Sequence, residues 1–180
     1  MRAGDWDQSI DRAWGTCNRW WGMDRPTEAS VFLRFSKLTP AGVARTFMAL
    51  KARSVEHRTG SLWASQEGFD PNCTGTEESL EKLAIGALHS MTIHYVWKSG
   101  ERRLEALLTV TRMKRGQLRA NLHVLWSSIG TSSCDMKSRF HVLLGHGHEL
   151  LQLLEAKDLE VGRQPTGVGT TREKWLRLTG

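Results

Sequence analysis

The chain has 180 residues, of which 39% are hydrophobic and 24% are charged, so it can form one domain with a core and is not wholly disordered. Its formal net charge of +6 favours a polyanionic partner but carries no information about the fold. There is no run of 18 apolar residues and no apolar segment near the N-terminus, so we expect neither a transmembrane segment nor a signal peptide. The three cysteines, Cys17, Cys73 and Cys134, are widely spaced and odd in number, which is typical of a reduced intracellular protein, cytoplasmic or nuclear.

Residues 5–22 carry four of the eight tryptophans, and their apolar positions recur every three or four residues. This spacing predicts an amphipathic helix that ends near Gly22. The rings of Trp14, Trp20 and Trp21 are candidates for stacking on nucleic-acid bases or for docking on a partner. The alternative is that the rings cover the core of a small domain. We treat residues 1–28 as a Trp-rich helical extension.

Residues 29–38 alternate between apolar and polar side chains and predict a strand with Leu33 and Phe35 on its inner face. The strand leads into Thr39 and Pro40, which suit the N-cap and the first position of a helix. A long connection over residues 54–75, with one short strand within 60–65, follows this helix. A second helix is expected after Thr76, because two acidic residues follow it.

Three further segments alternate with a period of two, at 91–97, 104–110 and 118–126, and short glycine-containing turns join them. They predict an antiparallel meander with one buried face. A last amphipathic helix is expected over about 135–156. The predicted fold class is α+β, an antiparallel sheet of about four to five strands with helices packed on one face. An α+β domain would span residues 29–158, and a flexible tail would span residues 159–180; the family resemblance described below implies that this domain is regulatory.

The sequence contains no phosphate-binding glycine loop, nucleophile elbow or protein-kinase signature, so no catalytic residue is assigned. His141, His146 and His148 are not spaced like zinc ligands on a helix. We expect them to face solvent, and we assign no metal and no cofactor. Gly145 and Gly147 lie inside the same predicted helix, where each costs about 1 kcal/mol. They mark either a kink or close packing on the sheet.

Basic residues are concentrated around the turns of the meander and at the start of the last helix. Clustered Arg and Lys side chains on rigid hairpins suit phosphate groups and anionic membranes. We expect the hairpin tips to project together from one edge of the sheet. The alternative is that these charges only solvate the hairpin ends. The predicted anion-binding residues are Arg102, Arg103, Lys114, Arg115, Arg119, Lys137 and Arg139.

The segment VFLRFSKLTPAGVARTFMAL, the basic pair Arg102 and Arg103 before two long strands, and Lys137, Arg139 and Phe140 in the last helix carry a resemblance. This order resembles the kinase-associated C-terminal domain of checkpoint-type serine/threonine kinases, over about residues 29–156. The resemblance implies a non-catalytic regulatory module that binds anionic phospholipid or a kinase catalytic domain. The chain would then be a fragment or a detached relative of such a kinase.

Two other functions remain open from the sequence. One is binding of RNA or single-stranded nucleic acid by the basic sheet together with the N-terminal tryptophans. The other is an adaptor whose Trp-rich helix docks on a partner protein.

Overall fold

The computed structural model describes residues 3–21, 31–53, 56–57, 63–64, 89–99, 102–124, 136–163 and 174–178. Its α-helices are α1 (Ala3–Trp21), α2 (Pro40–Arg53) and α4 (Met136–Leu153). Its longer strands are β1 (Val31–Leu38), β4 (Ser90–Ser99), β5 (Arg102–Arg112), β6 (Leu118–Val124) and β7 (Asp158–Arg163). The short strands are β2 (Glu56–His57), β3 (Trp63–Ala64) and β8 (Lys174–Arg177). A 3-10 turn, η1 (Lys114–Gly116), joins β5 to β6.

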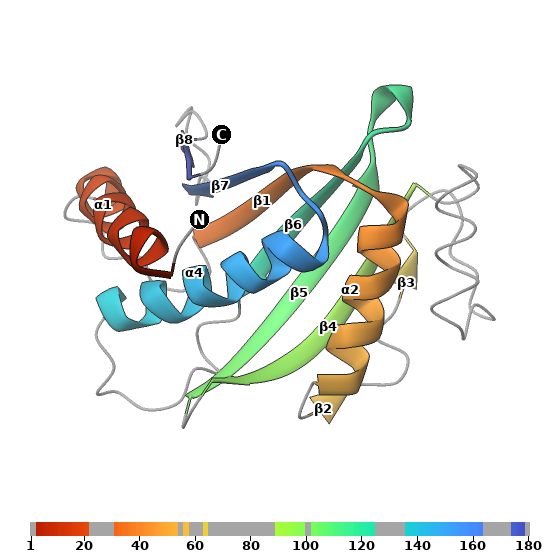
Figure 1. Cartoon of the computed structure of the whole chain (residues 1–180), viewed down its shortest axis with the longest axis horizontal. Coiled ribbons are helices and arrows are strands. Elements are labelled where there is room, and N and C mark those ends of the chain that lie inside the picture. The colour runs from red at the N-terminus through yellow and green to blue at the C-terminus, as the bar shows by residue number, and fades with distance from the viewer. Residues whose placement is uncertain are drawn as a thin grey trace, which may run out of the picture.

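The strands form one antiparallel sheet in the order β2-β4-β5-β6-β1-β7-β8, and β3 also pairs with β4 (Figure 1). The α+β class is therefore confirmed, with more strands than the four to five expected. The additional strands have two sources. The connection after α2 contributes β2 and β3, and the chain after α4 contributes β7 and β8. As a result β1 lies inside the sheet, between β6 and β7, and not at its edge.

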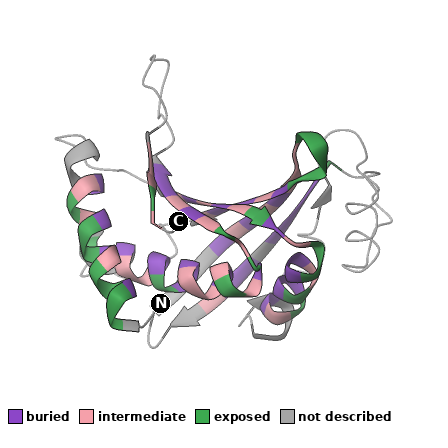
Figure 2. Cartoon of the chain, turned by 45° about the horizontal axis from the view of Figure 1, so that its top comes forward, coloured by how far each residue is buried: buried purple, intermediate pink, exposed green. Residues whose placement is uncertain are grey.

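The period-two pattern of the sequence directs alternate residues of each strand toward the helices. Those residues form the core, and α2 and α4 lie across this face with α1 beside α4 (Figures 1 and 2). The buried strand residues include Leu33, Phe35, Ile93, Tyr95, Leu108, Val110, Ala120, Leu122, Leu159 and Val161. This alternation is what leaves the opposite face free for polar side chains.

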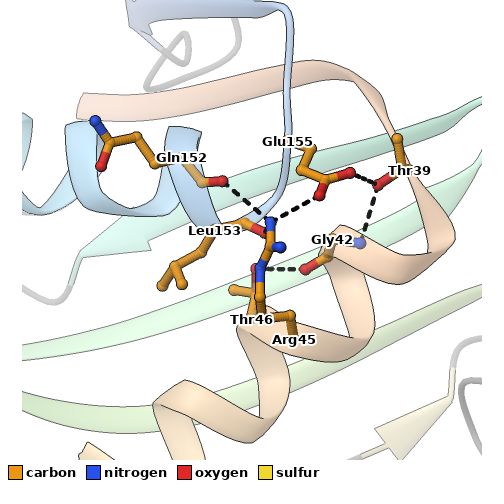
Figure 3. Close-up of polar contacts among 7 residues, drawn as sticks. All are labelled: Thr39, Gly42, Arg45, Thr46, Gln152, Leu153 and Glu155. Carbon is orange, nitrogen blue, oxygen red and sulfur yellow. Dashed lines mark hydrogen bonds and ion pairs between the residues drawn. The ribbon is translucent and has the colours of Figure 1, made fainter.

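Hydrogen bonds and an ion pair join the N-terminus of α2 to the C-terminus of α4 (Figure 3). Thr39 caps α2 as predicted, since its Oγ1 accepts a hydrogen bond from the Gly42 amide at 2.9 Å. Thr39 also donates to the Glu155 carboxylate at 2.6 Å, and Arg45 donates to the Leu153 carbonyl at 2.9 Å. Gly42 is needed here because a Cβ would come within 2.2 Å of the Leu154 carbonyl oxygen.

Helix α1 forms part of the domain core, whereas the sequence analysis treats residues 1–28 as an extension. Trp6, Ile10, Ala13 and Cys17 of α1 are buried in the same core as the sheet residues. The Trp6 indole donates a hydrogen bond to the Leu144 carbonyl of α4 at 3.2 Å. Burial raises the pKa of the Cys17 thiol to about 12, so it stays protonated and packs as an apolar group.

The segment that the sequence analysis expects to be a flexible tail differs in the same way. Residues 158–163 pair with β1 as β7, and residues 174–177 pair with β7 as β8. The pairing of β7 with β1, more than 120 residues earlier, is not visible in the local sequence. The helix expected after Thr76 and most of the 54–75 connection lie outside the described residues.

Candidate functional site

The face of the sheet turned away from the helices is the candidate site. The alternation that buries Leu33 and Phe35 places Phe32, Arg34 and Ser36 on this face, with partial exposure. Arg119, Asn121 and His123 of β6 and Asp158 and Glu160 of β7 lie beside them in register. The surface is thus built from the central strands β6, β1 and β7, which are held by hydrogen bonds on both sides.

A stack of three groups lies on this face at the β1–β7–β8 end of the sheet. The Trp175 ring lies on Gly162, where a Cβ would come within 2.4 Å of the ring. The Arg34 guanidinium carbon lies 3.9 Å from the centre of the Trp175 ring, in a cation–π contact. Arg34 also donates to the Glu160 carboxylate at 2.7 Å. The arginine is thereby held in one orientation with its charge partly exposed.

A second charged group lies next to the stack. Asp158 accepts from Lys37 at 3.1 Å and also pairs with Arg177. Hydrogen bonds from Lys37 and Arg177 lower the pKa of the Asp158 carboxyl below its usual value. Lys37 is placed for this contact by a bulge in β1, where its φ is +58°. Further along the same face, the Phe32 and His123 rings stack at 4.7 Å.

These side chains surround a hollow of about 610 Å³ between the β5–β6 turn and the β1–β7–β8 end of the sheet. Five basic residues and two carboxylates line it, so its formal charge is positive. We call it the basic hollow, and its lining residues are Arg34, Ser36, Lys37, Met113, Lys114, Gln117, Leu118, Arg119, Asp158, Glu160 and Arg177.

Two of the predicted anion-binding residues, Lys114 and Arg119, line the basic hollow. Arg115 lies beside them in the exposed turn η1, with a φ of +66°. Arg102 and Arg103 are at the other end of β5, next to the turn that joins it to β4. Since a strand rises about 3.3 Å per residue, roughly 30 Å separates the two turns. The structure therefore does not bring the hairpin tips together at one edge.

The remaining predicted residues lie on the helical side or outside the described side chains. Lys137 is exposed at the start of α4, 3.6 Å from Asp11 of α1. Arg139 lies in α4, and its side chain is outside the described set. Trp14 packs against Phe140 with ring centres 5.4 Å apart, which agrees with the alternative that the α1 rings cover the core. The side chains of Trp20 and Trp21 are also not described.

The three histidines of α4 do not simply face solvent, so this expectation is wrong. His146 is buried, and its Nε2 shares a hydrogen bond with Tyr95 Oη at 2.6 Å. His148 stacks on Trp6 at 4.7 Å, and His141 lies 3.1 Å from the Asp11 carboxylate. Each of these histidines contacts a side chain of another element. The spacing of residues along α4 does not reveal such contacts. Within the described ranges, no three His, Cys, Asp or Glu side chains converge as metal ligands would.

Arg34, Lys37 and Arg177 are site residues that were not predicted from the sequence. Arg34 could have been found from its position, because the alternation of β1 places it on the face opposite Leu33 and Phe35. Arg177 could not, since residues 174–177 do not alternate between apolar and polar side chains. In the described part of the chain, no helix is long and apolar enough to span a membrane.

The fold and the site define an α+β protein with an antiparallel sheet, one face of which carries no helix among the described residues. The sequence matches no protein-family model and no curated protein. The structure is similar to a chain in the crystal structure of the toxic C-terminal tip of CdiA from Pseudomonas aeruginosa in complex with immune protein. The TM-score is 0.53 and the identity 14%, over 76% of this chain and 88% of that chain. At this identity the likeness concerns the fold.

This similarity overturns the resemblance to a kinase-associated domain. The expected checkpoint-kinase regulatory function, with phospholipid or a kinase domain as partner, is therefore wrong. The architecture differs from the expected one for a physical reason. The chain continues beyond α4 into β7 and β8, and α1 packs into the core. The alternatives of a nucleic-acid-binding protein and of a Trp-helix adaptor gain no support from the similarity and are set aside.

Proposed function

We propose that this protein is an immunity-type protein that binds a toxin protein through the face of its sheet that is turned away from α2 and α4. The fold supports this proposal, because the similar chain belongs to a complex of a toxic CdiA tip with immune protein. The observation that carries it is the surface itself: aromatic and arginine side chains are held in fixed orientations across β1, β7 and β8.

The composition of this face suits a protein interface. Tryptophan and arginine supply much of the binding energy at protein–protein contacts, and Trp175 and Arg34 lie together at the β1–β7–β8 end of this face. Both are already restrained, Trp175 by Gly162 and Arg34 by Glu160. Binding therefore costs less side-chain entropy than it would for free side chains.

The charge of the face indicates the chemistry of the partner. Five basic residues line the basic hollow, together with only two carboxylates. An acidic protein surface would complement this excess and would be steered toward it by long-range attraction. The partner is therefore a toxin with an acidic patch of a size that fits the hollow.

Co-expression of the full chain with the product of each neighbouring reading frame in its genome tests the proposal. We expect a complex on size-exclusion chromatography and relief of growth arrest in the producing cells. The double variant Lys114→Glu/Arg119→Glu changes the basic hollow and should weaken the complex about tenfold or more, mainly through a slower association rate. Added salt should weaken the wild-type complex in the same direction.

The matched control is Arg12→Glu/Lys137→Glu, which makes the same change of net charge on the exposed surface of α1 and α4. It should bind as the wild type does. Equal weakening by both double variants would contradict the assignment of the face. Growth arrest by this chain alone would place it on the toxin side of the pair, and absence of any complex would refute the function.

A further inference from the structure

The charged side chains of the basic hollow divide into two groups. The first group lies on β1, β7 and β8 and consists of three bases and both carboxylates. Its members pair with one another: Arg34 with Glu160, and both Lys37 and Arg177 with Asp158. Because three bases are set against two carboxylates, this wall of the hollow is close to neutral.

The other two bases of the hollow, Lys114 and Arg119, belong to the β5–β6 turn and the strand that follows it. Lys114 lies in η1, and Arg119 is the second residue of β6, opposite Ser36 of β1. In the part of the chain that the structure describes, neither base is paired with a carboxylate. Most of the unpaired positive charge of the hollow is therefore next to this turn.

Arg115, between these two bases in sequence, has a backbone conformation that glycine or asparagine usually adopts. Its φ is +66° and its ψ is +19°, in the left-handed region, and Gly116 follows with a φ of +73°. A residue with a Cβ is strained in this region. Replacement of Arg115 by glycine or asparagine would relieve the strain, so the fold alone does not account for an arginine here.

Lys37 and Glu155 are the other non-glycine residues with a positive φ in the described ranges. Each of them pairs its charged side chain within the chain, Lys37 with Asp158 and Glu155 with Arg45. Arg115 is exposed, and among the described residues it has no such partner. A strained residue without an intramolecular contact indicates a contact with another molecule.

The backbone of the turn has a defined shape, and the turn projects from the end of the sheet into solvent (Figures 1 and 2). The Met113 N–H donates to the Gln117 carbonyl at 2.6 Å, and the Gly116 N–H donates to the Met113 carbonyl at 3.1 Å. A Cβ on Gly116 would come within 3.2 Å of the Arg112 guanidinium. The bases of the turn are thus attached to an ordered backbone, which lowers the entropy cost of binding.

We infer that the β5–β6 turn binds an oxyanion through Lys114, Arg115 and Arg119. Arginine and lysine side chains donate charge-assisted hydrogen bonds to the oxygens of a carboxylate or phosphate group. The source of the anion rests on the proposed function: it is an aspartate or glutamate side chain of the toxin. The strongest charge contact of the complex is then at this turn and not at the paired wall of the hollow.

Titration of the ¹⁵N-labelled full chain with inorganic phosphate and with glutarate tests the site without the toxin. The Gly116 amide signal and the Arg119 Nε–H signal should shift and saturate, and sodium chloride at equal ionic strength should not reproduce these shifts. Arg119→Gln should weaken phosphate binding about fivefold, as for a partly exposed charge pair. Arg177→Gln removes a paired arginine from the other wall of the hollow, so it should weaken binding by less than about twofold.

Arg115→Asn separates anion binding from folding. Asparagine tolerates the left-handed conformation, so the thermal midpoint should stay the same or rise, whereas phosphate binding should weaken about threefold. The control Arg12→Gln removes one positive charge from the exposed surface of α1 and should leave binding unchanged. The inference is overturned by a wild type without saturable shifts, by equal effects of Arg119→Gln and Arg177→Gln, or by a lower thermal midpoint in Arg115→Asn.

The proposed complex identifies the source of the anion. We expect phosphate to compete with the toxin and Arg115→Asn to weaken the complex. A toxin complex that still binds phosphate, with the same shift at Gly116, would show that the occupant is a free anion and not a toxin carboxylate. Phosphate binding without any toxin complex would refute the proposed function alone and would leave the turn as an oxyanion site.

Discussion

Gly145 and Gly147 are two residues apart in α4 and have opposite surroundings. Gly145 has open space above it, whereas Gly147 is buried against Leu33 of β1. The sequence leaves a kink and close packing equally open. The structure shows close packing at Gly147, because at this position the helix backbone approaches the sheet.

Alanine at these two positions should change stability in opposite directions. Gly145→Ala should raise the free energy of unfolding by about 1 kcal/mol, through helix propensity alone. Gly147→Ala should lower it by about 1–2 kcal/mol, because Leu33 must move within a packed core. Urea denaturation of both variants measures the difference. Stabilisation by Gly147→Ala would contradict the close approach of α4 to β1.

Buried His146 makes stability depend on pH. Burial lowers the pKa of His146 from about 6.5, against smaller opposing effects of Glu149. As pH falls through about 6.5, the unfolded chain takes up a proton that the folded chain still excludes. The contribution of neutral, buried His146 to the free energy of unfolding is therefore fully present above pH 7. It is lost as pH falls below about 6.5, at up to about 1.4 kcal/mol per pH unit.

The expected result is a thermal midpoint that falls between pH 7.5 and pH 5.5 in the wild type and falls less in His146→Gln. Glutamine keeps an amide that can hydrogen-bond Tyr95. Hydrogen bonds lower the pKa values of Glu155 and Asp158, so their contributions are lost only below about pH 4.5, outside this range. Identical pH profiles for the two proteins would exclude His146 as the cause.

At the scale of elements, the contact between α2 and α4 joins the start of α2 to the end of α4 (Figure 3). Helix α4 ends in a Schellman arrangement, in which Ala156 N–H donates to the Leu151 carbonyl and Glu155 N–H to the Gln152 carbonyl. Glu155 adopts a φ of +53° at the position that glycine usually occupies. Its side chain is directed to Thr39 and Arg45, which accounts for an acidic residue there.

Gly42→Ala should lower the free energy of unfolding by about 2–4 kcal/mol, because the Leu154 backbone would have to move to admit a Cβ. Arg45→Met should have a smaller effect, since half of the Arg45 side chain is exposed. Urea denaturation measures both. Met48→Ala in the same helix is the control, because Met48 is 62% exposed, and it should change stability by less than about 0.5 kcal/mol. An equal effect of Gly42→Ala and Met48→Ala would show that α2 and α4 are not in close contact.

On the scale of the whole molecule, the sheet separates two surfaces with different chemistry. The side that faces α2 and α4 carries the core, and the opposite side carries the basic hollow. The hollow exists because β7 returns beside β1 and brings Asp158 and Glu160 against Arg34 and Lys37. Arg102 and Arg115 are separated for a different reason. Successive turns of an antiparallel meander lie at opposite ends of the strands that they join.

Local patterns in the sequence sufficed for the strand before Thr39, the start of α2 at Pro40, the inner faces of the meander and most of α4. Such patterns suffice because a period of two or of 3.6 decides which side chains leave water, whatever lies opposite. They could not reveal the neighbours. Arg34 meets Glu160 across 126 residues and Tyr95 meets His146 across 51, so only strand order and helix docking determine these contacts. The basic hollow depends on such long-range pairs, because a binding site needs groups from several elements in one place.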